Sequence, residues 1–202
     1  MQAERDRIEQ VLSGDLQAFQ ALIEDYERLV CHIVFRMVTN EEDREEICQD
    51  VFVKVYQNLA KFEFKSKLST WIGRISYNTC INYLKKRKLL LYDDLAEKES
   101  EGFGKSTREA TASYVESVSG DLPIPDEFMM NQEMTGFLFA EINDLPVKFR
   151  TIITLYHLDQ LSYAEIGEIM NLPEGTVKSY LFRARKLLKE RLLEKYPAEE
   201  LF

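Results

Sequence analysis

The sequence contains few residues that could hold a metal ion or a disulfide framework. Among its 202 residues there are 3 cysteines and 2 histidines. Cys31, Cys48 and Cys80 are widely spaced and form no Cys-x-x-Cys pair, and neither histidine belongs to a cluster with zinc-site spacing. Each cysteine lies in an apolar stretch with helical periodicity. We therefore expect buried, reduced thiols and no metal or other cofactor.

Long apolar runs are also missing. No segment approaches the roughly 18 apolar residues that a membrane-spanning helix needs. Residues 1–7 are polar and mixed in charge, unlike the start of a secretory signal. We therefore expect a cytoplasmic protein with no membrane insertion. The hydrophobic fraction of 45% is enough for a packed core, and the length allows one large domain or two small ones.

Negative charge predominates but is unevenly distributed. The net charge is −9, yet residues 61–88 contain 8 basic residues and 1 acidic residue. Residues 176–202 contain 7 basic and 4 acidic residues, and the rest of the chain is acidic. Local basic patches decide where nucleic acid binds, whereas the overall charge weakens nonspecific binding to DNA. This distribution indicates a protein that needs a partner before it binds DNA firmly.

Helical periodicity runs through most of the chain, and no strand-like alternation persists. We expect an all-α fold of two small helical domains, residues 1–90 and 128–196. Residues 91–127 are rich in acidic residues, Ser, Thr and Gly, which predicts a flexible acidic linker. The expected helices span residues 15–38, 41–59, 69–90, 128–143, 147–158, 162–170 and 174–195.

The strongest local signal is a helix-turn-helix motif. Ser162 and Glu165 have the spacing of a capping box at the start of a short helix. Gly167 allows a second helix to cross closely. Asn171 stands where the chain must turn sharply, and asparagine tolerates the left-handed conformation. Pro173 then favours the start of the second helix, and two helices joined in this way form a DNA-reading unit.

The second helix of this motif has two different faces. The stripe expected to be buried consists of Val177, Leu181, Ala184 and Leu188. On the opposite face Phe182 lies among cations, where it has no core to join. Its ring could contact a thymine methyl group while Arg183 or Lys178 reaches base edges or phosphates. The candidate DNA-contacting residues are Thr176, Lys178, Ser179, Phe182, Arg183 and Lys186. The alternative is a charged, solvated helix surface, which the helix-turn-helix context disfavours.

The basic segment 61–88 mixes aromatic residues and amides with its cations. Such a mixture suits single-stranded DNA, because cations follow the phosphates and rings stack on bases. The candidate DNA-binding residues here are Phe62, Phe64, Lys65, Lys67, Ser69, Trp71, Arg74, Asn78, Asn82, Lys85 and Lys86. The alternative is that Trp71 and the two phenylalanines cap a small core while the cations are solvated. For Trp71 alone the two interpretations are equally weighted.

The helix expected at 41–59 offers a different kind of surface. Its acidic and polar stripe contains Glu46, Gln49, Asp50, Val53 and Gln57. An acidic stripe does not attract DNA, so it is either a solvated face or a docking face for a protein partner. Periodicity alone favours the solvated face.

Together these segments resemble extracytoplasmic-function sigma factors of RNA polymerase. Residues 40–43, 49–56 and 70–78, with Leu59 and Phe62, are similar to region 2 of that family. Residues 145–146, 162–170, 173–179 and 183–185 are similar to region 4. The resemblance covers about four-fifths of the chain, and both halves occur in the family's order and spacing.

The resemblance implies a role for each surface. Glu46, Gln49, Asp50 and Val53 match the stretch that docks on the clamp-helix coiled coil of the largest polymerase subunit. The segment that begins with loop 61–69 matches the part that melts the −10 element and holds an everted base. The face around Phe182 matches the part that reads the −35 element. The expected partners are core RNA polymerase, promoter DNA and an anti-sigma factor, and the protein is expected to be no enzyme.

Some positions depart from the family pattern. Gly167 replaces a usual alanine and Asn171 a usual glycine, and both changes preserve the turn. Ser76 replaces a common alanine. Tyr180 stands where the family commonly has a basic residue, so one phosphate contact is in doubt. Loop 61–69 varies within the family, and the −10 bases therefore do not follow from the resemblance.

Three other functions account for less of the sequence. A conventional helix-turn-helix repressor or activator would be a dimer on a palindromic site, and segment 61–88 would have no purpose in it. A nucleic-acid enzyme needs clustered carboxylates with a metal, or a nucleophile beside a base. The acids at 41–50 lie beside no histidine or basic cleft. A pure protein-interaction module, such as an anti-sigma regulator, leaves the recognition helix unexplained.

Overall fold

The computed structural model describes residues 2–98 and 132–195, with side-chain surroundings for residues 3–87 and 138–195. The regular secondary structure of these residues is helical, without a strand among them, which confirms the all-α prediction. The elements are α1 (Gln2–Leu12), α2 (Leu16–Met37), α3 (Glu41–Asn58), η1 (Leu59–Lys61), α4 (Leu68–Lys98), α6 (Gln132–Asn143), α7 (Val147–His157), α8 (Tyr163–Met170) and α9 (Glu174–Lys195).

The first four α-helices form one packed group around α2. Asp15 caps α2 by accepting hydrogen bonds from the backbone of Gln17 and Ala18, at 2.8 and 3.1 Å. Asn40 caps α3 by accepting one from the backbone of Glu42 at 3.0 Å, and an acidic first turn follows. The core of this group includes Leu22, Val30, Ile33, Val51, Val55, Leu59, Leu68 and Ile72, each at most 2% exposed.

Helix α1 was not expected from the sequence. Its only large apolar residues in the inner face are Ile8 and Val11, which are 3% and 1% exposed against the first group. An exposed ion pair between Arg7 and Asp25 also links α1 to α2. The helix therefore covers one side of α2 with a short apolar contact, too short to produce clear periodicity.

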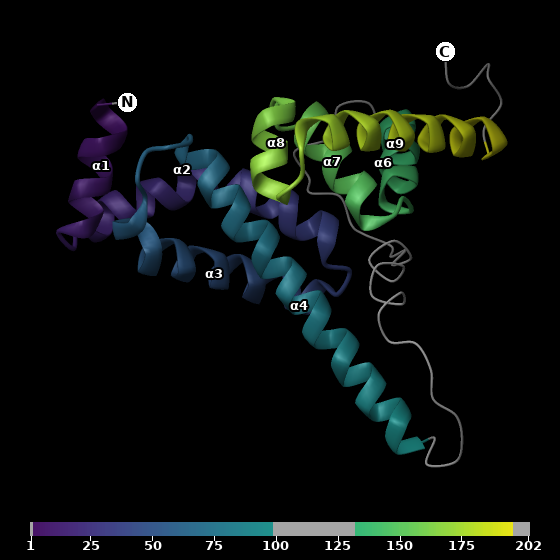
Figure 1. Cartoon of the computed structure of the whole chain (residues 1–202), viewed down its shortest axis with the longest axis horizontal. Helices are drawn as coiled ribbons and strands as arrows, with labels where there is room; N and C mark the ends of the chain where they lie inside the picture. Colours follow the sequence, from purple (N-terminus) through teal and green to yellow (C-terminus); the bar gives the residue numbers. More distant parts are fainter. Residues whose placement is uncertain (1, 99–131, 196–202) are drawn as a thin grey trace.

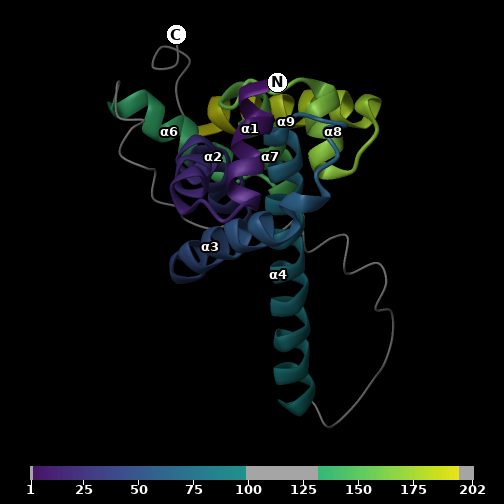
Figure 2. The same cartoon turned by 90° about the vertical axis from the view of Figure 1, so that its left-hand side faces the viewer.

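Helix α4 is longer than expected. It continues to Lys98, so the expected domain boundary at residue 90 falls inside the helix, and residues 91–98 of the expected linker are helical. Its second half extends away from the other helices (Figures 1 and 2). Residues 99–127 of the expected linker lie outside the described residues.

The second group contains α6 to α9 and the expected helix-turn-helix. Ser162 and Glu165 form the capping box at the start of α8, and Asn171 ends that helix in the left-handed conformation with φ 54° and ψ 51°. The chain is tight at this turn, because a Cβ at Gly167 would lie 2.7 Å from the carbonyl oxygen of Leu172. The expected inner stripe of α9 is correct for Val177, Leu181 and Ala184, which are buried; the fourth member, Leu188, is half-buried.

The two groups pack directly on each other, α7 against α2 and α8 against α4 (Figure 1). The α4–α8 contact is apolar and close at Gly73, since a Cβ there would lie 2.8 Å from Cδ1 of Ile169 in α8. The same Cβ would lie 3.6 Å from Cδ1 of Ile33 in α2. Nothing in the sequence predicted this contact, because it joins residues far apart in the chain.

The α2–α7 contact is polar. Arg36 donates to the side chain of Asn143, and Arg150 donates to the carbonyl oxygens of Arg36 and Asn143. Nearby, Nδ1 of His32 lies 2.6 Å from a carboxylate oxygen of Asp159. Burial is the main reason why the pKa of Arg36 and that of Arg150 each fall to about 10, and neighbouring guanidinium groups add to the effect. We call this group of side chains the arginine interface.

Candidate nucleic-acid and polymerase interfaces

The outer face of α9 presents the expected DNA-contacting residues to solvent. Phe182 is 70% exposed, an unusual environment for a phenylalanine. Lys178, Ser179, Arg183 and Lys186 are exposed around it, and Thr176 is half-buried. The Ser179 hydroxyl donates to the carbonyl oxygen of Gly175 at 2.9 Å, so it already has a local partner. The face thus combines an exposed ring with cations, as the sequence predicted.

Two tyrosines and two cations form a ladder along the edge of this face. The rings of Tyr156 and Tyr163 are stacked, with centroids 5.1 Å apart and planes 9° apart. Lys178 lies over the Tyr163 ring, its Nζ 5.3 Å from the centroid, and Arg185 lies over Tyr156 at 5.1 Å. Nε of Arg185 also donates to His157 at 3.2 Å. We call these residues the cation–tyrosine ladder.

The ladder holds two cations of α9 against α7 and α8, and sequence reasoning missed Arg185 and both tyrosines. The signal in the sequence that could have indicated the ladder is the pair of tyrosines at positions 156 and 163. Cation–π contacts restrict the two long side chains without neutralising them. Lys178 additionally pairs with Glu174 at 2.7 Å, and the hydrogen bond to that carboxylate is the main reason why its pKa is raised.

Tyr180 packs inward, away from the exposed face. It is half-buried, and its ring meets that of Phe149 edge to face with centroids 5.8 Å apart. A tyrosine at this position therefore anchors α9 to α7. The departure from the family pattern exchanges a basic residue for a packing contact.

The basic segment begins with a loop that folds over an aromatic cluster. Phe62 and Trp71 are buried, 7% and 9% exposed, with ring centroids 5.4 Å apart. Phe64 is 38% exposed, has a φ of 56°, and lies 4.7 Å from Phe62. Arg5 of α1 covers its ring at 4.6 Å. In this structure Phe62 and Trp71 pack as the core-capping alternative describes, while Phe64 remains partly accessible.

Beside this cluster lies a cavity of about 280 Å³, lined by Lys61, Phe62, Glu63, Lys65, Ser66, Trp71, Arg74 and Glu168. All lining residues but one come from the loop and α4, and Glu168 comes from α8. Lys65 and Lys67 are exposed, and Ser69 is half-buried. Lys67 pairs with Glu165 of α8 at 2.8 Å. The acidic side of α8 therefore faces the cations that the sequence assigns to DNA.

Glu165, the carboxylate that pairs with Lys67, has an unusually low pKa. Burial raises the pKa of Glu165, but hydrogen bonds from Lys67 and from the side chain and backbone of Ser162 outweigh it, and the pKa falls to about 2. The same carboxylate thus closes the capping box of α8 and binds the loop of the first group.

Farther along α4, the remaining candidates form an exposed polar face. Arg74, Asn78, Asn82, Lys85 and Lys86 are all exposed. The opposite face carries Ile72, Ser76 and Cys80, which are fully buried. The structure therefore separates this part of α4 into an exposed polar face and a buried face.

Helix α3 presents the acidic stripe outward. Glu46, Gln49 and Asp50 are exposed, and Val53 is 52% exposed. The stripe continues with Tyr56, which is 46% exposed and meets Phe19 edge to face at 5.0 Å. Sequence reasoning missed Tyr56. Two exposed apolar side chains among acids are more typical of a docking face than of a solvated one.

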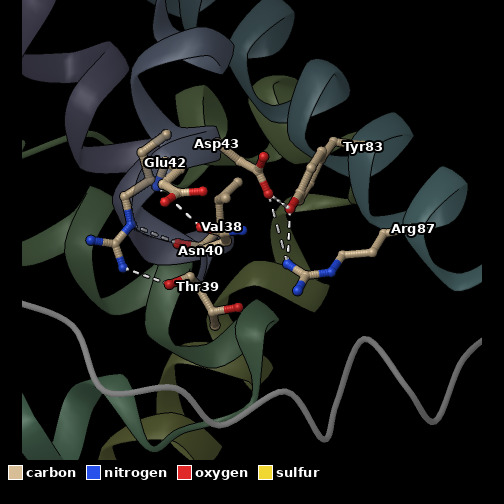
Figure 3. Close-up of polar contacts among 8 residues, drawn as sticks. Val38, Thr39, Asn40, Glu42, Asp43, Tyr83 and Arg87 are labelled. Atoms are coloured by element: carbon tan, nitrogen blue, oxygen red, sulfur yellow. Dashed lines mark hydrogen bonds and ion pairs between the residues drawn. The ribbon is translucent and has the colours of Figure 1, made fainter. Parts of the chain in front are cut away.

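A groove of about 550 Å³ runs between α3 and α4 beside this stripe. Asp43, Glu46 and Asp50 make its α3 wall acidic, and Lys86 and Arg87 make its α4 wall basic. At its end the Tyr83 hydroxyl donates to Asp43 and accepts from Arg87 at 2.9 Å (Figure 3). On the other side of α3, Arg44 donates to the carbonyl oxygens of Val38 and Thr39, both at 3.0 Å. These bonds fix the start of α3 relative to α2 and α4.

Comparison with known proteins places this arrangement in a family. Residues 22–89 match the family of Sigma-70 region 2, and residues 138–188 match that of Sigma-70, region 4. The chain is 33% identical over 188 residues to the ECF RNA polymerase sigma factor SigW of Bacillus subtilis, covering 93% of this chain and 96% of the relative. It is 34% identical to the ECF RNA polymerase sigma-E factor of Escherichia coli K12, covering 92% of each.

The chain belongs to the ECF sigma factors. As a sigma factor it binds core RNA polymerase and directs promoter recognition, melting and transcription initiation. The region 2 match begins within α2 and ends within α4, and the region 4 match begins within α6 and ends within α9 at residue 188. Helix α1 lies outside both matches.

Solved structures share the fold of this sigma factor. The chain resembles CnrH in its complex with the cytosolic domain of CnrY, with a TM-score of 0.62, 19% identity, and coverage of 96% of this chain and 99% of that one. It also resembles the sigma factor RpoE in its complex with the anti-sigma factor NepR from Bartonella quintana, with a TM-score of 0.62, 20% identity, and coverage of 90% and 100%.

The described residues contain neither a cluster of metal ligands nor a helix that could span a membrane. Within residues 2–98 and 132–195, no group of three or more His, Cys, Asp or Glu side chains is arranged to hold a metal ion. No helix in that part of the chain combines the length and apolarity needed to cross a membrane.

Proposed function

We propose that this sigma factor works through three separate surfaces: the stripe on α3 for core polymerase, the loop and α4 for the −10 element, and α9 for the −35 element. The observation that carries the proposal is the 70% exposure of Phe182 among cations on the second helix of a helix-turn-helix. An exposed ring there costs solubility unless a partner covers it, and a thymine methyl group fits that role.

The −35 assignment is tested by promoter-specific transcription with core polymerase. A double variant, Phe182→Ala with Arg183→Ala, should lose promoter-specific transcripts while still binding core polymerase. Lys189→Ala, an exposed lysine farther along α9, is the matched control and should retain transcription. Full activity of the double variant would contradict the assignment of this face to the −35 element.

For the −10 element, we propose that the exposed cations and amides of α4 hold the melted strand. Arg74 lines the cavity beside the loop, and Asn78 follows it on the same exposed face. Phe64 is the accessible ring of the loop, whereas Phe62 and Trp71 would contact a base only after a rearrangement. A fluorescent adenine analogue in the −10 element reports melting. Arg74→Ala with Asn78→Ala should reduce its signal in holoenzyme, with closed-complex binding preserved.

We propose that Glu46, Gln49, Asp50 and Val53 dock on core polymerase, with Tyr56 extending that surface. Asp50 also pairs with Lys54 at 3.7 Å, an exposed i,i+4 pair that a partner can easily reorganise. Reversing charge with Glu46→Lys and Asp50→Lys should lower the affinity for core polymerase by at least tenfold. Reversal at Glu24, an exposed acid on α2, is the control. Undiminished binding of the double variant would contradict the docking assignment.

The remaining assignments follow from the same reasoning. We propose that residues 1–90 and 128–196 act as two domains, and that the linker expected at 91–127 begins only after α4 ends at Lys98. We also propose that the protein is cytoplasmic and has no enzymatic activity. We also propose an anti-sigma factor as a partner, because the acidic and apolar stripe on α3 and the groove beside it offer a surface that a competitor of core polymerase could cover. Copurification from cells, followed by identification of polymerase subunits, tests the binding of core RNA polymerase directly.

A further inference from the structure

Two of the three cysteines are in contact. Sγ of Cys31 on α2 and Sγ of Cys48 on α3 are 4.0 Å apart. The short connection at residues 38–40 folds α3 back against α2 and brings these positions together. Both thiols are free and half-buried, whereas Cys80 is fully buried. Cys80 is therefore buried as expected, whereas Cys31 and Cys48 are only half-buried.

We propose that Cys31 and Cys48 form an oxidisable dithiol, which a peroxide converts into a disulfide between α2 and α3. The Cys31 thiolate attacks one oxygen of hydrogen peroxide, the O–O bond breaks, and hydroxide leaves with the electron pair. The resulting sulfenic acid is attacked by the Cys48 thiolate, its S–O bond breaks, and a second hydroxide leaves. The two thiol protons convert both hydroxides to water, so two thiols are oxidised and one peroxide is reduced.

The order of attack follows from the hydrogen bond within the pair. The hydrogen bond between the two thiols is the main reason why the pKa of the Cys31 thiol is lowered, and burial and Glu27 oppose the shift. The same bond raises the pKa of Cys48, and burial raises it further. Since the thiolate is the reactive species, Cys31 is the nucleophile and Cys48 the resolving cysteine.

The geometry makes the bond accessible. A disulfide needs a sulfur separation of roughly 2 Å, so the two sulfurs, now 4.0 Å apart, must approach by about 2 Å. Half-burial admits a small oxidant. Cys80 is the competing partner, because its thiol is close enough to Cys48 to raise the pKa of that group. Full burial, however, keeps Cys80 from a small oxidant in the folded protein.

The disulfide would brace the first group of helices. It closes a loop that contains the end of α2, the 38–40 connection and the start of α3, and restricting that loop in the unfolded chain stabilises the folded state. Cys48 lies next to Gln49, so the disulfide would restrict the turn of α3 that carries the proposed docking stripe. Formation of the disulfide itself does not depend on that docking assignment.

The test uses the full-length reduced protein treated with hydrogen peroxide. Labelling of the remaining thiols should fall from three to one, and the intact mass should fall by two hydrogens. Peptide mass spectrometry should show Cys31 joined to Cys48, and dithiothreitol should reverse the change. The melting temperature should be higher after oxidation than after reduction.

Variants distinguish the roles of the three thiols. Cys80→Ser should still form the bond, and Cys48→Ser should instead leave a sulfenic acid on Cys31 that dimedone traps. A Cys48–Cys80 link or a disulfide between molecules would overturn the proposal. So would retention of all three thiols at a peroxide dose that oxidises glutathione.

Discussion

Among single residues, Asn171 has the most demanding backbone in the helix-turn-helix. Its φ of 54° lies in the left-handed region, where a side chain with a Cβ is strained. Asparagine tolerates this conformation better than alanine does. We expect Asn171→Ala to lower the free energy of unfolding by about 1 kcal/mol, measured by urea denaturation followed by circular dichroism.

Glycine provides the matched comparison at the same position. Asn171→Gly removes the strain altogether, so it should leave stability within a few tenths of a kcal/mol of the wild type or above it. If the alanine and glycine variants were equally stable, the turn would not depend on left-handed geometry.

The cation–tyrosine ladder gives a second expectation at this scale. Tyr163→Leu removes the ring under Lys178 and the stack with Tyr156, at 5.3 and 5.1 Å. An exposed cation–π contact contributes roughly 0.5–1 kcal/mol, so the affinity of region 4 for −35 DNA should fall by about two- to fivefold. Fluorescence anisotropy with a −35 duplex measures it.

Tyr163→Phe retains the ring and should retain most of the affinity, which separates the ring from the hydroxyl. Arg185→Ala should in addition reduce the salt dependence of binding by about one phosphate contact. Equal binding by the leucine and phenylalanine variants would show that the ladder does not contribute to DNA recognition.

At the level of helices, the sequence predicted the elements whose ends are chemically marked. Ser162, Glu165 and Asn171 all occupy the positions expected of them at the ends of α8, because these local hydrogen bonds depend only on neighbouring residues. The two faces of α9 likewise follow from periodicity. The exposure of Phe182 was predictable because no apolar neighbour shared its face.

Other features could not be predicted because they depend on contacts between distant segments. Helix α1 has only a short apolar edge and is held by α2. Arg36 and Arg150 would be expected at the surface, since arginine is rarely buried without partners. Their partners lie in the other group, 107 and 114 positions away in the chain. For Trp71 the sequence favoured core packing and DNA contact equally, because its environment depends on how loop 61–69 packs on α4.

The start of α8 should be sensitive to acid. The pKa of Glu165 in the folded protein, about 2, is below its ordinary value of 4.5, because hydrogen bonds from Lys67 and Ser162 outweigh the effect of burial. The lowered pKa means that this contribution to stability is fully present above pH 4.5 and is lost as the pH falls towards 2. Carbon-13 NMR of the carboxyl group measures its titration directly.

Lys67→Met should move that titration upward, because it removes the strongest donor. Lys65→Met is the control, since Lys65 pairs with Glu63 in its own loop. An unchanged Glu165 titration in Lys67→Met would show that the Lys67 contact does not form in solution.

For the whole molecule, the packing of α8 on α4 determines how accessible the proposed −10 surface is to DNA. Glu165 and Glu168 face Lys67 and the cavity beside Arg74, so an anionic strand meets carboxylates before it meets cations. Gly73→Leu should force the groups apart, because even a Cβ there would lie 2.8 Å from Ile169. Small-angle X-ray scattering should then show a larger radius of gyration.

Asn78→Leu places the same side chain on an exposed position of α4 and should leave the radius unchanged. The separated Gly73→Leu protein should also bind single-stranded −10 DNA more tightly than the wild type. A compact Gly73→Leu protein would mean that Ile169 adjusts without loss of contact.

The arginine interface has a consequence for what happens once α7 leaves α2. The newly exposed surfaces of this contact would display guanidinium, amide and carbonyl groups, which water solvates well. Opening would also expose apolar side chains such as Ile169 at the α4–α8 contact. The polar groups therefore reduce the share of apolar surface that appears on opening, and with it the tendency of the opened protein to aggregate.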